Sequence, residues 1–210
     1  MNMDNSVFFR PWVGKDYPTG GIFGKKILVV GESHHCADQC VGCGTEACAA
    51  CHALTTNVIK DYLDPNKWER CMNTFLKFER SLVNRAAAGP EEKQAIWDSL
   101  AFYNYLQVSM SQSRQAGTPG QYRAAALPFF SVLNELRPDA LIVWGVRLWG
   151  RMTGEHWQNG PAVVVENYAV QNGQYTLDDG TPVPTVCVYH PAAGYRWDFW
   201  HKALQATVLK

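Results

Sequence analysis

Five of the seven cysteines lie within the segment 36–51. They are Cys36, Cys40, Cys43, Cys48 and Cys51, and the last four form two pairs with the spacing C-x2-C. Two residues between ligands allow both sulfurs to reach one metal ion, so the spacing predicts zinc bound by thiolates. An iron–sulfur cluster and unliganded redox thiols are the alternatives. We expect the metal to be structural and to tie down a loop at about 34–52.

The surroundings of these cysteines favour free thiolates over disulfides. An odd number of cysteines argues against a disulfide framework. The first residues lack the basic and apolar regions of a secretory signal, and no apolar run approaches the ~20 residues that a membrane span needs. We therefore expect a cytoplasmic protein with no membrane partner. Of the other two cysteines, Cys71 and Cys187, we expect both to lie in the core.

Polar side chains follow three segments that have the pattern of strands. Glu32 follows a β-branched run at 25–31, and Asn104 lies in an aromatic run at 100–108. His190 follows the strand-like region within 160–188. A carboxylate can position a water or stabilise positive charge, and a carboxamide matches the hydrogen-bonding edge of a nucleobase. An imidazole can donate to an oxygen that gains negative charge. Taken singly, each residue is also explained by a structural role.

The elements that must position these side chains alternate along the chain. Strands are predicted at 25–31, 100–108, 140–144 and within 160–188, and helices at 54–63, 68–88, 91–99, 122–136, 147–152 and 195–209. This order predicts an α/β fold, a three-layer α/β/α sandwich with a largely parallel central sheet. Thr55 or Thr56 is expected to cap the first helix, and Trp68 and Cys71 to lie on the apolar stripe of the second. In such folds ligands bind beyond the carboxyl ends of the strands.

Length and composition set limits on the class of protein. With 210 residues, 47% of them hydrophobic, the chain has material for one domain spanning 1–210 and its core. The formal net charge of zero excludes a protein that coats nucleic acid by bulk positive charge, although a local basic patch is compatible with it. Five arginines are either solvated or available for phosphate contacts: Arg114, Arg123, Arg147, Arg151 and Arg196.

The order of strand-end motifs resembles the uracil-DNA glycosylase superfamily. The similar segments are GESHH at 31–35, AFYNYLQ at 101–107, LNELRPDALIVWGVRLW at 133–149 and YHPAAGY at 189–195. The resemblance implies two catalytic residues: Glu32 acting on the water or the sugar cation, and His190 stabilising the departing base anion. It also implies a set of residues that bind the extruded base, namely Asn104, Gly31, Ser33 and His34. A base inside a duplex must be extruded before its glycosidic bond can be reached.

The chain also departs from the motifs of that superfamily. Ser33 and His34 replace an Asp-Pro or Ala-Pro pair, and Ala192 replaces the Ser after His-Pro. No ring follows GESHH where members stack one on uracil; Phe8, Phe9, Trp12 and Tyr17 are candidates to supply it. The leading hypothesis is a DNA glycosylase that hydrolyses the N-glycosidic bond of an altered base. The alternatives are a non-catalytic module that binds a nucleobase or nucleic acid, and a catalytic metal site that combines His34 and His35 with thiolates.

Overall fold

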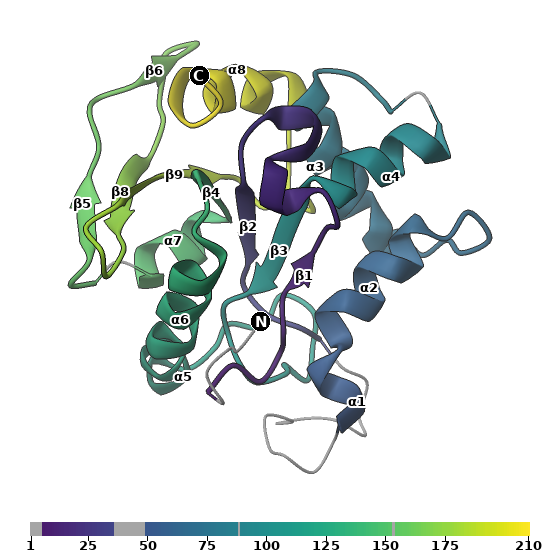
Figure 1. Cartoon of the computed structure of the whole chain (residues 1–210), viewed down its shortest axis with the longest axis horizontal. Coiled ribbons are helices and arrows are strands. Elements are labelled where there is room, and N and C mark those ends of the chain that lie inside the picture. Colours follow the sequence, from purple (N-terminus) through teal and green to yellow (C-terminus); the bar gives the residue numbers. More distant parts are fainter. Residues whose placement is uncertain (1–5, 36–48, 88, 153) are drawn as a thin grey trace.

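A seven-stranded sheet forms the centre of the computed structural model, which describes residues 6–35, 49–87, 89–152 and 154–210 (Figure 1). The strand order is β1-β3-β2-β4-β9-β8-β5. The strands are β1 (Trp12–Val13), β2 (Ile27–Gly31), β3 (Leu100–Asn104), β4 (Ala140–Trp144), β5 (Trp157–Asn159), β8 (Asn172–Thr176) and β9 (Pro182–Val188). A separate hairpin joins β6 (Val164–Val165) to β7 (Tyr168–Ala169).

The sheet is parallel in its middle and antiparallel at its edges. Strands β3, β2, β4 and β9 are parallel, whereas β1 pairs antiparallel with β3, β8 with β9, and β5 with β8. The prediction of a largely parallel sheet therefore holds for the central four strands only, and the sheet as a whole is mixed. Every residue of β2, β3 and β4 is buried, as expected for strands covered on both faces.

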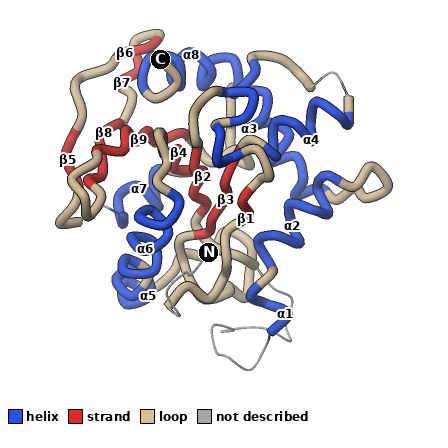
Figure 2. The backbone as a smooth tube through the Cα atoms, viewed as in Figure 1, coloured by secondary structure: helices blue, strands red, loops and turns tan. Residues whose placement is uncertain are grey.

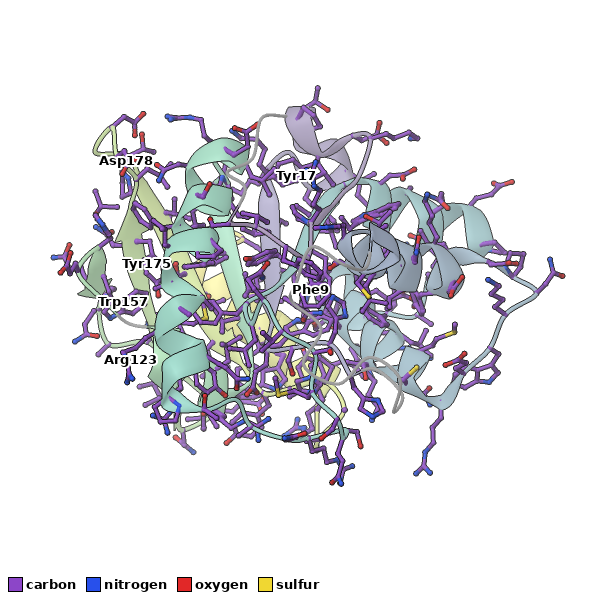
Figure 3. The ribbon with its side chains drawn as sticks, turned by 90° about the horizontal axis from the view of Figure 1, so that it is seen from below. Phe9, Tyr17, Arg123, Trp157, Tyr175 and Asp178 are labelled. Carbon is purple, nitrogen blue, oxygen red and sulfur yellow. The ribbon has the colours of Figure 1, made fainter. Side chains whose placement is uncertain are left out.

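Helices cover both faces of the sheet, with strands between two helical groups in Figure 2. On the face of Ile27 and Val29 lie α2 (Leu54–Leu63), α3 (Asn73–Val83), α4 (Pro90–Asp98) and α8 (Trp197–Thr207). On the face of Leu28 and Val30 lie α5 (Pro119–Ala124), α6 (Ala126–Leu136) and α7 (Val146–Met152). The short α1 (Ala49–His52) precedes α2. On the outer part of the sheet, Trp157 and Tyr175 are cross-strand partners whose rings lie 5.1 Å apart (Figure 3).

Two predicted helices differ from those observed. The helix predicted at 122–136 is divided at Ala125 into α5 and α6, because Pro128 has no N–H to donate and its ring clashes with the carbonyl of Ala124. The helix predicted at 68–88 shrinks to α3, which ends where Asn84 adopts a left-handed φ of 59°.

Three predictions about single side chains near the starts of α2 and α3 were wrong. Trp68 precedes α3 and is 65% exposed, and Cys71 is also exposed, so neither belongs to the core. Neither Thr55 nor Thr56 caps α2: its N-cap residue is Ala53, and Thr55 is buried. Cys187 is in the core as predicted, and burial raises the pKa of its thiol to about 12.

The carboxyl ends of the four parallel strands meet at one edge of the sheet. They are Gly31 of β2, Asn104 of β3, Trp144 of β4 and Val188 of β9. In the sheet, β3 lies on one side of the neighbouring pair β2 and β4, and β9 lies on the other. The connections from β2 to β3 and from β4 to β9 therefore run in opposite directions across the sheet, and the strand order reverses between β2 and β4. Such a switch point, outside the carboxyl ends, is where open α/β sheets bind ligands. No helix within the described residues is both long and apolar enough to span a membrane.

Candidate functional site

The carboxylate of Glu32 sits at the switch point and is held by two side chains. The Nε of Arg147 donates to both carboxylate oxygens at 2.9 Å, and its Nη2 lies 2.9 Å from Oε2. The hydroxyl of Tyr122 also donates to Oε1. Glu32 comes directly after β2, while Arg147 comes three residues after the end of β4, so this ion pair bridges the two strands that flank the switch point.

The pKa values of the partners fit this arrangement. Burial, followed by the hydrogen bond to the carboxylate, raises the pKa of Tyr122 to about 12, so its hydroxyl keeps its proton and acts as a donor. The hydrogen bond to Glu32 raises the pKa of Arg147 above its ordinary value. The carboxylate is only 10% exposed in its side chain. It therefore accepts bonds from two donors that stay protonated at neutral pH.

Asn104, at the end of β3, is buried and bonded to His34. Its Nδ2 lies 3.2 Å from Nδ1 and 3.1 Å from Nε2 of the imidazole, and Nε2 lies 2.8 Å from Oγ1 of Thr55. One tautomer satisfies the three groups: Asn104 donates to Nδ1, and the Nε2–H donates to the Thr55 hydroxyl. Burial lowers the pKa of His34 to about 4, so the ring is neutral at pH 7. The Asn104 amide nitrogen carries two N–H groups, so one can donate to His34 while the other donates to a base.

Gly31 leaves the space that Asn104 needs. The two residues are paired in the sheet, and a Cβ on Gly31 would lie 2.4 Å from Oδ1 of Asn104 and 3.2 Å from the ring of Phe102. Real Cβ atoms do not approach other heavy atoms as closely as 2.4 Å. The glycine that ends the predicted strand is thus required by the side chain of the neighbouring strand. Its φ is not in the left-handed region, so the requirement is steric.

His190 leaves β9 at the same edge and contacts the end of β4. Its ring lies 6.0 Å from that of Trp144 in an edge-to-face arrangement, and a Cβ on Gly145 would lie 3.5 Å from its Cβ. The backbone N–H of Ala192 donates to Nδ1 at 3.2 Å, so the neutral ring carries its proton on Nε2. Burial lowers the pKa of His190, as do the charges of Arg147 and Arg114, whereas the charge of Glu32 raises it. The imidazole is therefore a neutral donor at pH 7.

The structure brings the three predicted strand-end residues to one edge. Asn104 and Glu32 are linked through adjacent residues of paired strands, because Gly31 pairs with Asn104. Phe102 and Trp144 connect the Asn104 strand to His190 through ring contacts of 5.0 and 6.0 Å. Of the remaining predicted residues, Ser33 is half-buried between Glu32 and His34. His35 is exposed and its backbone forms an isolated bridge with Met110, whereas His34 is buried and bonded to Asn104 and Thr55.

The segment before β1 covers this edge and supplies a ring. Phe9 is fully buried and its ring lies 4.9 Å from that of His34, near the middle of the view in Figure 3. The side chain of Gln107 accepts the N–H of Phe9 and donates to the carbonyls of Asn104 and Tyr105. β3 ends at Asn104, short of the predicted end at Val108. Among the four candidate rings, Phe9 is the one in contact with a predicted base-binding residue.

Most of the predicted metal site lies outside the described residues. Cys36, Cys40, Cys43 and Cys48 fall in that part, so their arrangement is not described. Cys51 is buried and packs with Phe8 and Phe9. Within the described residues, no group of three or more His, Cys, Asp or Glu side chains could hold a metal ion. Zinc binding by the five cysteines stays a prediction.

Several residues of the site were not assigned this role from the sequence. From the sequence, Tyr122 was assigned only to a helix, Thr55 only to a helix and its cap, and Arg147 only to solvent or a phosphate contact. Nothing in the local sequence links them to Glu32 or His34, because the partners are separated by 90, 21 and 115 positions. The other arginines vary: Arg114 accepts a bond from Arg147 through its carbonyl, and Arg151 lies over the ring of Tyr122. Arg123 is exposed (Figure 3).

Comparison with known proteins adds no relative from which roles could be transferred. The sequence matches no protein-family model, and no curated protein is similar enough to count as a match.

Proposed function

We propose that this protein is a DNA glycosylase-like enzyme that hydrolyses the N-glycosidic bond of an altered base. One observation supports this most: the residues that the sequence singles out for three different tasks, Glu32, Asn104 and His190, come from three strands to one carboxyl edge. Cleavage of a glycosidic bond needs a group that stabilises the sugar cation or positions water, and a donor to the leaving base. A carboxylate and a neutral imidazole at the same edge fit these needs.

Glu32 and His190 have defined parts in the proposed reaction. The carboxylate of Glu32, fixed by Arg147 and Tyr122, stabilises the positive charge that develops on the sugar and orients the attacking water. The Nε2–H of His190 donates to the carbonyl oxygen of the base as the bond breaks and negative charge moves onto the base. The ring is neutral at pH 7, so it stabilises the base anion through a hydrogen bond. The glycosidic electron pair leaves with the base, water adds its hydroxyl to the sugar, and the second proton of the water neutralises the base anion.

A second function is favoured by a different observation. Both oxygens of Glu32 and the Nδ2 of Asn104 already have partners within the protein. A protein that only binds a nucleobase or a nucleic-acid end has no need of a carboxylate that is accessible to water. This module would bind single-stranded DNA or free base with a salt-dependent affinity and without turnover.

Base release from a panel of oligonucleotides separates the two functions. Strands carrying uracil, hypoxanthine or other altered bases are incubated with the protein and then cleaved by alkali at abasic sites. The enzyme hypothesis predicts cleavage of at least one substrate by the wild type and its loss in Glu32→Ala. Equal inertness of both proteins on every substrate, with binding that Asn104→Ala weakens, would favour the binding module.

A further inference from the structure

An aromatic pocket lies beside the candidate site and is not used by the proposed reaction. Its volume is about 240 Å³, and its lining residues come from the β6–β7 hairpin, the loop after β9 and the start of α8. They are Glu166, Tyr168, Tyr189, Gly194, Arg196, Phe199 and Trp200. Figure 1 shows the hairpin lying next to α8, apart from the main sheet. The hairpin and the segment 189–200 thus form one pocket rich in rings.

One ring of the pocket is partly exposed. Tyr189 is 39% exposed, and its ring centroid lies 5.1 Å from that of the buried Trp200. Tyr168 and Phe199 meet edge to face at 5.6 Å on the hairpin side. Aromatic side chains on a protein surface provide platforms on which a flat ring can stack.

The charges at the pocket are already compensated. Arg196 lies 2.8 Å from Asp198 and 3.6 Å from Glu166, and Lys202 lies 2.5 Å from Glu166. Two cations thus face two anions, so the pocket has no excess charge to attract a phosphate. A ligand held here is recognised through its flat apolar face.

The position of Tyr189 indicates which flat group this is. Tyr189 directly precedes His190, and its ring contacts Trp200, whereas the ring of His190 contacts Trp144. Because Tyr189 and His190 are consecutive residues, a nucleotide next to a base held against His190 lies within reach of Tyr189. We propose that this pocket binds an unpaired nucleobase that neighbours the altered base in single-stranded DNA. This inference rests on the proposed function, since it assumes that the altered base lies at the carboxyl edge.

Equilibrium binding tests the pocket without requiring turnover. The probes are short fluorescent single strands with 2′-fluoro-2′-deoxyuridine, whose glycosidic bond resists hydrolysis, and with either normal bases or abasic sites on both sides of it. Stacking on an aromatic side chain contributes roughly 1–3 kcal/mol per base, so Tyr189→Ala should weaken binding of the first probe about 5- to 150-fold. Tyr189→Phe keeps the ring and should bind as the wild type does. Trp68→Ala removes an exposed ring between α2 and α3 and is the matched control.

The abasic probe provides the decisive comparison. Wild type should bind it more weakly than the normal probe by the same factor, and Tyr189→Ala should reduce that binding no further. Equal loss of affinity for both probes in Tyr189→Ala, or no loss for either, would overturn the inference, and so would a wild type that binds neither probe. Base-specific binding that depends on Tyr189, in a protein that releases no base from any natural substrate, would support the pocket and refute the proposed catalysis.

Discussion

The Nε of Arg147 lies 2.9 Å from both carboxylate oxygens of Glu32, and this ion pair joins the ends of the two strands between which the strand order reverses. Glu32 is buried, whereas the side chain of Arg147 is 46% exposed. Loss of the guanidinium would therefore leave a buried charge without its cation, whereas loss of the carboxylate would leave a cation that water can solvate.

Removal of the guanidinium should destabilise the fold. Arg147→Met leaves a buried carboxylate with Tyr122 as its remaining described side-chain partner, and we expect a loss of about 1–2 kcal/mol in the free energy of unfolding, after allowance for the exposure of Arg147. Urea denaturation at pH 7.5 measures this loss. The control is Arg137→Met, which breaks an ion pair with Asp179 whose two side chains are both about half exposed. A larger loss in the control than in Arg147→Met would contradict this account of the pair.

Gly31 should not tolerate a methyl group. Gly31→Ala places a Cβ against Oδ1 of Asn104, and we expect it to destabilise the protein by about 1–3 kcal/mol and to weaken base binding through displacement of Asn104. Thermal denaturation and ligand titration measure the two effects. Gly150→Ala in α7 is the control, because no neighbouring atom lies within 4 Å of its added Cβ and alanine is the better helix former. If both variants were as stable as the wild type, the close approach of Asn104 would be refuted.

The buried imidazole of His34 should make stability depend on pH. Its pKa is about 4 in the folded protein against an ordinary value of 6.5, so between these values the unfolded chain binds more protons. Stability is therefore complete above pH 6.5 and falls as the pH drops toward 4, by about 3 kcal/mol in total. His34→Gln keeps hydrogen-bonding groups but does not titrate, and its unfolding free energy should decline less over this range. His35→Gln changes an exposed neighbour and should keep the wild-type slope, whereas identical slopes in wild type and His34→Gln would exclude this role.

The cysteine segment predicts bound metal. Protein purified without added metal should contain about one zinc ion per chain, and removal of the ion should expose thiols of the segment 36–51 to titration. Elemental analysis and thiol titration measure both quantities. Brown protein that contains iron and sulfide would instead support the iron–sulfur cluster. Colourless protein with far less than one ion per chain and five reactive thiols in the segment would end the metal hypothesis.

The parts of the fold that were predicted correctly are those with a strong local signal. The apolar runs that became β2 and β4 are long enough to identify buried strands, and the alternation with helices gave the parallel centre. The strands β1 and β5 were missed because they have only two and three residues and owe their pairing to a neighbouring strand. Ala125 shows a further limit, since the helix break there follows from a proline three residues later.

The sequence indicated three residues of the candidate site but not the side chains that bond to them. Strand ends locate Glu32, Asn104 and His190, because parallel strands end at a common edge. Arg147 and Thr55 were not identified, since an ion pair or a hydrogen bond between distant segments leaves no pattern in either segment alone. The sequence could not show that Asn104 is bonded to His34 for the same reason.

The most direct test of the proposed function is the single-turnover rate of base release from the best substrate of the oligonucleotide panel. We expect the wild type to release the base, and Glu32→Gln and His190→Gln to do so at least about 100-fold more slowly while they still bind the strand. In wild type the rate should persist somewhat below pH 6.5, because the lowered pKa of His190 keeps its ring neutral there, and decline at lower pH. Two results would contradict catalysis by these residues. One is release at the wild-type rate by both variants, and the other is no release by the wild type or either variant on any substrate.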